Sequence, residues 1–220
     1  MLTENIRFMT GVKGMMLALP MMTAMAVSAQ ETDRWMPEIH GTVRAKYEYE
    51  PSLDAGRFEV RNCRIALTGK VMPAVEYKAE IDLSDEGDIR MLDAYVRLTP
   101  VERLTLTAGQ MRVPFTIDAH RSPHLQYFAN RSFIAKQVGN VRDVGAEIGY
   151  TWNVGFPIVV NAGIFNGSGL TNQKDYWTKG VNYSAKAQFL FPNVNLVLST
   201  QKIKPYDVTV TMYDGGITFH

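Results

Sequence analysis

The stretch Val75-Glu76-Tyr77-Lys78-Ala79-Glu80-Ile81-Asp82-Leu83 alternates apolar and charged residues one by one. A period of two residues is that of a β-strand, in which successive side chains point to opposite faces. One face of this strand is wholly apolar and the other wholly charged, so the strand separates hydrocarbon from water. A soluble sandwich also alternates, but its outward face rarely needs a charge at every second position. The pattern is instead typical of a membrane barrel, whose apolar residues face lipid and whose polar residues face a wet lumen.

Alternation of the same kind continues along most of the chain, in stretches of about ten residues separated by turn signals. It predicts an all-β fold, an antiparallel up-and-down transmembrane β-barrel, with about ten strands present. In the first stretch, Ile39 and Val43 share the apolar face, while Arg44 and Lys46 share the polar one. A slip in the alternation near Cys63 predicts a β-bulge. The expected strands cover 38–50, 58–72, 75–83, 92–98, 103–108, 144–152 and 183–191, with less distinct ones at 156–166, 194–202 and 207–213.

The connections between these stretches alternate between short and long. An up-and-down barrel of an outer membrane has this asymmetry, because its periplasmic turns are short and its external loops are long. A soluble β-sandwich gives no reason for the two lengths to alternate. The short connections are 72–74, 99–103, 153–155 and 192–193, and the long ones are 84–90, 113–141 and 167–180.

Residues 1–29 have the features of a secretory signal peptide. Arg7 and Lys13 precede an apolar run over 15–27, and the small residues Val27-Ser28-Ala29 provide a cleavage site. The run is shorter than the roughly 20 residues that a transmembrane helix needs, and an uncleaved helical anchor is the alternative. We therefore expect export to the bacterial outer membrane, with a signal peptide over 1–29, a leader over 30–37 and a barrel over 38–220.

Charge and cysteine content exclude several classes of function. The chain holds 23 basic and 22 acidic residues, and removal of the signal peptide leaves 21 of each, which argues against a nucleic-acid partner. Cys63 is the only cysteine, so an internal disulfide and a cysteine-based metal cluster are excluded. Ser122 and Ser132 lie near His120 and His124 in the sequence, but no nucleophile elbow accompanies them. We expect no enzymatic activity, no cofactor and no metal site.

Six short stretches, in their order and spacing, resemble the phosphate-selective porin O and P family of bacterial outer membranes. They are 77–82 (YKAEID), 93–96 (DAYV), 109–115 (GQMRVPF), 130–132 (NRS), 142–145 (RDVG) and 163–167 (GIFNG). The resemblance implies a homotrimer of barrels, each with about sixteen strands, an inward-folded third external loop and basic residues along the path. The chain then corresponds to roughly half to two-thirds of such a barrel.

The C-terminal residues Gly215-Gly216-Ile217-Thr218-Phe219-His220 predict a tight turn followed by the start of another strand. A barrel leaves no unpaired edge in lipid, because each exposed backbone group costs several kcal/mol. We therefore expect a chain that is truncated at its C-terminus. A small barrel whose final strand is misread is the alternative.

The long connection after 103–108 concentrates positive charge. From Arg112 to Arg142 it holds five lysines and arginines against Asp118 alone, and His120 and His124 add charge below about pH 6.5. Folded into the lumen, as the resemblance implies, this segment forms a positive constriction that attracts phosphate, carboxylates or other anions. Arginine suits the role because its planar donors hold an oxyanion and stay charged. The candidate pore-lining residues are Arg112, Arg121, Arg131, Lys136 and Arg142 in this segment, and Arg44, Lys46, Arg64, Lys70, Lys78 and Arg97 on the wall.

Pairing of these bases with acidic residues of the wall is the alternative, because it fastens the loop without making the pore selective. The acids available for such pairs are Glu48, Glu76, Glu80, Asp82, Asp93 and Glu147. Bases and acids on one wall also give a transverse field across the pore instead of net anion selectivity.

These observations predict an outer-membrane porin, a water-filled channel for passive diffusion of small hydrophilic solutes with a preference for anions such as phosphate. Its expected partners are these solutes, outer-membrane lipid and further copies of itself in a homotrimer. Two other functions stay open: a non-conducting outer-membrane barrel with a structural or adhesive role, and a soluble periplasmic β-protein. About ten strands closing on themselves leave little room in a lumen, which favours the non-conducting role for a complete chain.

Overall fold

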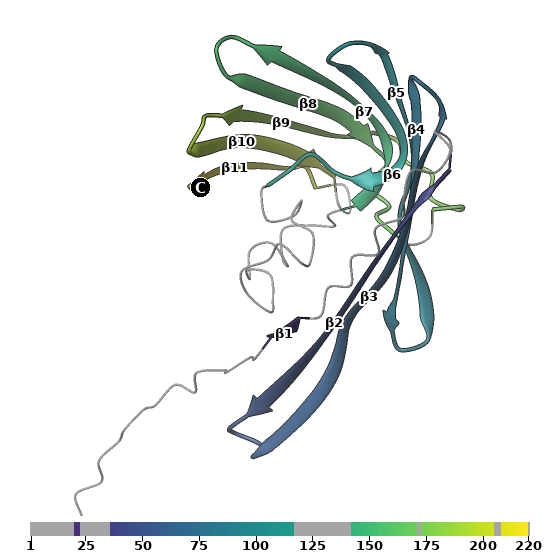
Figure 1. Ribbon diagram of the computed structural model, residues 1–220, viewed down its shortest axis with the longest axis vertical. Helices are drawn as coiled ribbons and strands as arrows, with labels where there is room; N and C mark the ends of the chain where they lie inside the picture. Colours follow the sequence, from purple (N-terminus) through teal and green to yellow (C-terminus); the bar gives the residue numbers. More distant parts are fainter. Residues whose placement is uncertain (1–19, 23–35, 117–141, 171–172, 205–207, 220) are drawn as a thin grey trace, which may run out of the picture.

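The computed structural model describes residues 20–22, 36–116, 142–170, 173–204 and 208–219. Within them the chain forms one antiparallel sheet, in which each strand pairs with its neighbours in sequence (Figure 1). This confirms the expected all-β, up-and-down architecture. No helix in the described ranges is long and apolar enough to cross a bilayer. The strands are β1 (Pro20–Met22), β2 (Glu38–Glu50), β3 (Ala55–Met72), β4 (Val75–Asp85), β5 (Asp88–Val101), β6 (Leu104–Arg112), β7 (Arg142–Asn153), β8 (Pro157–Phe165), β9 (Asn182–Leu190), β10 (Val194–Ile203) and β11 (Val210–Phe219).

Most strand positions follow the alternation in the sequence. The less distinct stretches 156–166 and 194–202 are the strands β8 and β10. The bulge expected near Cys63 lies at Arg61, because Arg44 pairs with Asn62 while the next residue, Ala45, pairs with Val60. One extra residue in β3 therefore brings the polar side chains of both strands back to the same face.

The long connection expected at 84–90 is wrong. β4 continues to Asp85 and β5 begins at Asp88, so Glu86 and Gly87 alone connect the two strands. Both residues have positive φ, 49° and 104°, which is the backbone of a two-residue hairpin turn. The glycine permits a tight turn, and the strands pair up to it.

The tight turn expected at Gly215-Gly216 is also wrong. Both glycines lie inside β11, opposite Leu198 and Val197 of β10. Pairing with β10 holds the backbone extended and overrides the turn preference of the two glycines.

The short strand β1 pairs with β2, with Pro20 opposite Lys46. It lies within the predicted signal peptide. Cleavage after residue 29 stays a prediction.

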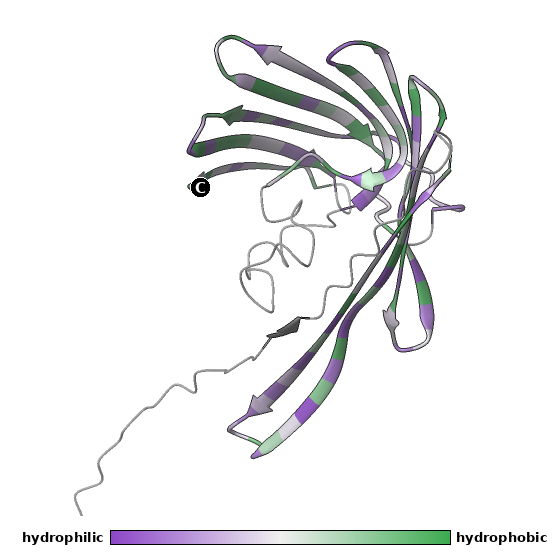
Figure 2. Ribbon diagram, in the orientation of Figure 1, coloured by the Kyte–Doolittle hydropathy of each residue, from purple (hydrophilic) through white to green (hydrophobic). Residues whose placement is uncertain are grey.

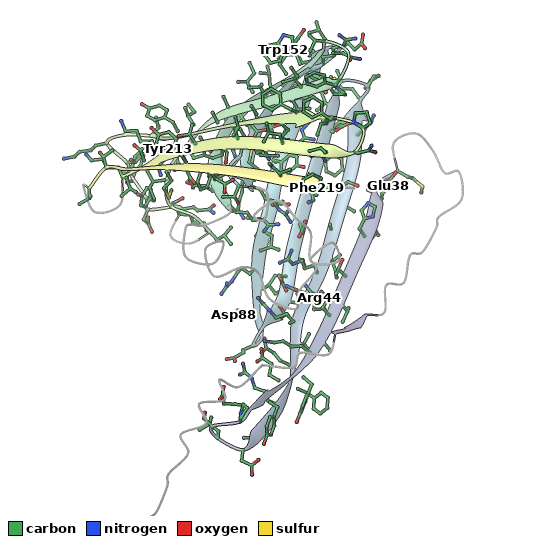
Figure 3. All side chains as sticks on the ribbon, turned by 90° about the vertical axis from the view of Figure 1, so that its left-hand side faces the viewer. Glu38, Arg44, Asp88, Trp152, Tyr213 and Phe219 are labelled. Atoms are coloured by element: carbon green, nitrogen blue, oxygen red, sulfur yellow. The ribbon has the colours of Figure 1, made fainter. Side chains whose placement is uncertain are left out.

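The two ends of the sheet differ in their connections. Short turns at 73–74, 102–103, 154–156 and 191–193 form one end. The other end, here the long-connection end, carries the connections 113–141, 166–181 and 204–209 together with the short turns 51–54 and 86–87. In Figure 3, Trp152 lies near the short turns and Asp88 lies toward the opposite end. β3 has 18 residues and β5 has 14, which makes them the longest strands. The hairpins β2–β3 and β4–β5 therefore project from the sheet at the long-connection end (Figure 1).

Burial is inverted relative to a soluble β-protein. On one face, here the inner face, polar side chains are buried, including Lys46 at 8 % and Asp93 at 2 % exposure. On the other, the outer face, large apolar side chains are exposed, including Ile39 at 72 % and Phe58 at 86 %. Figure 2 shows the two kinds of residue alternating along the strands. Such an outer face is stable against hydrocarbon, which agrees with the expected membrane barrel.

A small apolar cluster also lies on the inner face, where β6 ends. It consists of Met111, Val113, Phe115 and Phe165, with Tyr95 and Met212 packed against it. The Phe165 ring lies over Gly145 and Gly163, and a Cβ at either glycine would come within 2.7 Å of the ring. The two glycines therefore provide the space in which Phe165 is buried.

Candidate functional site

Six charged side chains form a network on the inner face of β3, β4, β5 and β7. They are Arg64, Lys78, Glu80, Asp82, Asp93 and Arg142, here the inner charge network. Asp93 accepts hydrogen bonds from Arg142 Nε at 2.6 Å and from Lys78 Nζ at 2.7 Å. Glu80 lies 2.7 Å from Lys78 and 3.5 Å from both Arg64 and Arg142. Arg64 Nε also donates to Asp82 at 2.8 Å. Three bases thus face three acids, and the network carries no net charge.

Arg142 comes from the end of the basic connection but is built into this wall. Its side chain keeps 5 % exposure and contacts acids on two other strands, Glu80 on β4 and Asp93 on β5. The structure places Arg64 and Lys78 in the same way, each with an acidic partner. Each of these three predicted pore-lining residues therefore has an acidic partner, and its role in a pore stays a prediction.

A second set of paired charges lies on the hairpin β2–β3. Lys46 contacts Glu48 and lies 3.1 Å from Glu59, while Arg57 lies 2.8 Å from Glu48 and 3.2 Å from Glu59. Lys70, another predicted residue, pairs with Glu76 at 3.4 Å near the short turns. These pairs also balance in charge.

Arg97, Arg44 and Arg112 belong to the strands themselves. Arg97 Nε donates to Thr107 Oγ1 at 3.2 Å, and its guanidinium lies 5.3 Å from the centre of the Tyr95 ring, a cation–π distance. Arg44 lies on β2 opposite Asn62, and Arg112 ends β6 opposite Arg142. These three arginines therefore belong to the strands of the wall.

Lys186 on β9 is an inner-face base that the prediction from sequence missed. Its side chain is buried, and in register it lies between Asn161 of β8 and Ser199 of β10. No ion pair joins Lys186 to any residue in the described ranges. The carboxylate of Glu147 interacts electrostatically with Lys186. Its hydrogen bond comes from Asn161 Nδ2, at 2.8 Å, and not from the lysine. The alternation between Ala185 and Ala187 already places Lys186 on the polar face, so the signal was present in the sequence.

The first residues after β6 cross the inner face. We call 113–116 the inner strap. Ser184 Oγ on β9 donates to the carbonyl oxygen of Pro114 at 2.8 Å, and Thr116 N–H donates to Ser199 Oγ on β10 at 3.1 Å. The basic connection therefore begins against the inner face, as the resemblance implies. Arg121, Arg131 and Lys136, with His120 and His124, lie outside the described residues, and their roles stay predictions.

Asp143 fixes the start of another long connection beside the strap. Its carboxylate accepts hydrogen bonds from the backbone N–H groups of Gly167 at 2.6 Å, Gly169 at 3.2 Å and Val144 at 2.8 Å. Three backbone donors satisfy this buried acid, and no base of the described residues forms an ion pair with it, so Asp143 orders the start of this connection.

Comparison with known proteins agrees with this geometry. The sequence profile of the family described as phosphate-selective porin O and P matches residues 38–199, which confirms the resemblance. No curated protein and no solved structure matches the chain. The match spans most of the chain, and the sheet has a polar inner face and an apolar outer face. The protein therefore belongs to the phosphate-selective porin O and P family of outer-membrane porins.

Proposed function

We propose that the protein lets small hydrophilic solutes diffuse passively through a water-filled lumen and favours anions, with phosphate as one of them. The observation that supports the preference is Lys186, a buried ammonium on the inner face with no ion-pair partner among the described residues. The carboxylate of Glu147 interacts electrostatically with both Lys186 and Arg97. A buried charge without a partner is costly, and a passing anion reduces that cost.

The mechanism is electrostatic and needs no covalent chemistry. The inner charge network and the pairs of β2–β3 cancel their own charges, so they shape the wall without favouring either sign. Lys186 then contributes positive potential beside the inner strap, because it lies opposite Ser199, whose Oγ accepts a hydrogen bond from the strap. A single base attracts an anion without holding it permanently, which is the condition for conduction.

Reversal potentials in a salt gradient across a planar bilayer test this preference. Lys186→Gln lowers the anion-to-cation permeability ratio by roughly two- to five-fold, because a unit charge a few ångströms away contributes about 1 kcal/mol in water. Arg103→Gln is the matched control, since it removes one positive charge at the exposed turn 102–103. An unchanged ratio in Lys186→Gln would remove Lys186 from the selectivity filter.

A homotrimer and a cleaved signal peptide belong to the same proposal. The family supports both, and the small residues at 27–29 support cleavage before Gln30. The mass of the protein purified from outer membranes reports the new N-terminus, and light scattering in detergent reports the number of copies.

A structural, non-conducting barrel is the second candidate. The apolar cluster around Phe165 and the inner strap fill part of the inner face, which favours a closed lumen. Folded protein that inserts into bilayers and gives no current steps would select this candidate.

A further inference from the structure

The outer face has an apolar hollow that spans β5 to β10. Its volume is about 640 Å³, within the roughly 300–1,000 Å³ of typical ligand pockets. Ala108 and Ala146 line it beside larger side chains such as Ile148 and Ile164, which are both 49 % exposed. Small residues next to large ones thus make a groove on a surface that otherwise contacts lipid.

Strand register explains the direction of this groove. Ala108, Ala146, Ile164, Tyr183 and Lys202 form one row of directly opposed residues across β6 to β10. Tyr183 and Lys202 lie next to the connections 166–181 and 204–209, at the long-connection end. The apolar groove therefore runs toward the outer leaflet and reaches a lysine and a tyrosine there, the residue types that anchor a barrel at the interface.

The charge at this end of the groove is positive. Lys202 is exposed, lines the hollow and has no ion pair with a described residue. Lys204, which is also exposed, follows directly after the end of β10, and its backbone N–H donates to Asn182 Oδ1 at 3.1 Å. Two ammonium groups beside an apolar groove complement a phosphate that is attached to acyl chains.

We propose that this hollow binds one phosphorylated acyl glycolipid of the outer leaflet. An acyl chain lies over Ala108 and Ala146, and a phosphate group contacts Lys202 and Lys204. The position at the long-connection end selects the outer-leaflet glycolipid over an inner-leaflet phospholipid. A second copy of the chain is a poorer occupant, because the exposed outer face that it would offer is apolar and supplies no anionic group to Lys202. This inference rests on the outer-membrane location and is independent of anion conduction.

Native mass spectrometry of the protein purified from outer membranes in mild detergent tests the proposal. The added probes are bis-phosphorylated lipid A, mono-phosphorylated lipid A and phosphatidylglycerol. One molecule of bis-phosphorylated lipid A binds at a concentration where phosphatidylglycerol does not. The double variant Lys202→Gln/Lys204→Gln weakens this binding at least roughly tenfold.

Matched variants separate the groove from general surface charge. Lys174→Gln/Lys179→Gln removes the same charge from the exposed connection 166–181 and leaves binding unchanged. Ala146→Leu keeps both lysines, fills the hollow and weakens binding. Equal binding of phosphatidylglycerol and lipid A, or no effect of Lys202→Gln/Lys204→Gln, would overturn the proposal. The proposal would also be overturned if Ala146→Leu dissociated oligomers and left lipid binding unchanged, because the hollow would then be occupied by another copy of the chain. Single-channel current from the same preparation reports the proposed function separately.

Discussion

Asp93 shows how a charged inner face remains stable. Its side chain is 3 % exposed and accepts short hydrogen bonds from Arg142 and Lys78. Burial makes each unpaired charge expensive, so the bases of this wall depend on the acid that joins them. The network is therefore a structural element of the wall.

Asp93→Ala tests this dependence. It leaves Arg142 and Lys78 with one acid fewer, and the free energy of unfolding falls by roughly 3–5 kcal/mol. Glu76→Ala is the control, because the Lys70–Glu76 pair is 52 % and 41 % exposed and contributes at most about 1 kcal/mol. Urea unfolding in lipid vesicles measures both variants. Equal losses in the two variants would show that burial does not set the strength of these pairs.

Gly145 allows β7 and β8 to pack closely because it has no side chain. A Cβ at this position would lie 2.1 Å from the carbonyl oxygen of Ile164 and 2.7 Å from the Phe165 ring. Gly145→Ala therefore moves β8 or the ring and destabilises the fold by roughly 1–3 kcal/mol. Gly41→Ala is the control, since a Cβ there meets nothing within 4 Å. The same unfolding measurement compares the two variants, and similar stabilities would contradict the close packing of β7 on β8.

At the scale of elements, the inner strap connects β6 to β9 and β10. Its Pro114 carbonyl accepts a hydrogen bond from Ser184 of β9, and its Thr116 N–H donates one to Ser199 of β10. These bonds hold residues 113–116, the start of the basic connection, against the inner face. Ser199 also donates to Asp214 of β11 at 3.3 Å, so the strap and the last strand share one anchor.

Removal of both hydroxyls frees the strap. In Ser184→Ala/Ser199→Ala each lost bond costs about 1 kcal/mol, and open-channel current noise rises because the strap moves. Thr211→Ala, on the exposed side of β11, leaves the noise unchanged. Identical noise in all three proteins would mean that these hydrogen bonds do not hold the strap in place.

The alternation of residues predicted the strands and their faces, since a period of two leaves little freedom once one face meets lipid. The turn at Glu86-Gly87 and the extended Gly215-Gly216 were not predictable, because strand pairing across β4–β5 and β10–β11 decides them. Which bases are neutralised also depends on pairing: Arg142 meets Asp93 from a strand 49 residues away in the chain. The alternation between Ala185 and Ala187 already placed Lys186 on the polar face. It was missed because the charges were summed only over residues 112–142.

At the scale of the whole molecule, the inverted burial divides the sheet into a lipid side and a lumen side. Ile148→Arg places a charge in the middle of β7 on the outer face and costs roughly 2–4 kcal/mol of stability in a bilayer. Val154→Arg, in the exposed turn 154–156, costs roughly 0–1 kcal/mol because the interface is polar. Unfolding from vesicles distinguishes the two, and an equal cost would contradict a lipid-facing outer face.

Single-channel recording in a planar bilayer tests the central claim most directly. The protein purified from outer membranes is added to one side of a salt gradient, and current steps and their reversal potential are recorded. The account predicts discrete steps whose reversal potential shows a preference for anions that Lys186→Gln reduces. Folded, inserted protein without steps, or steps with a preference for cations, would contradict it.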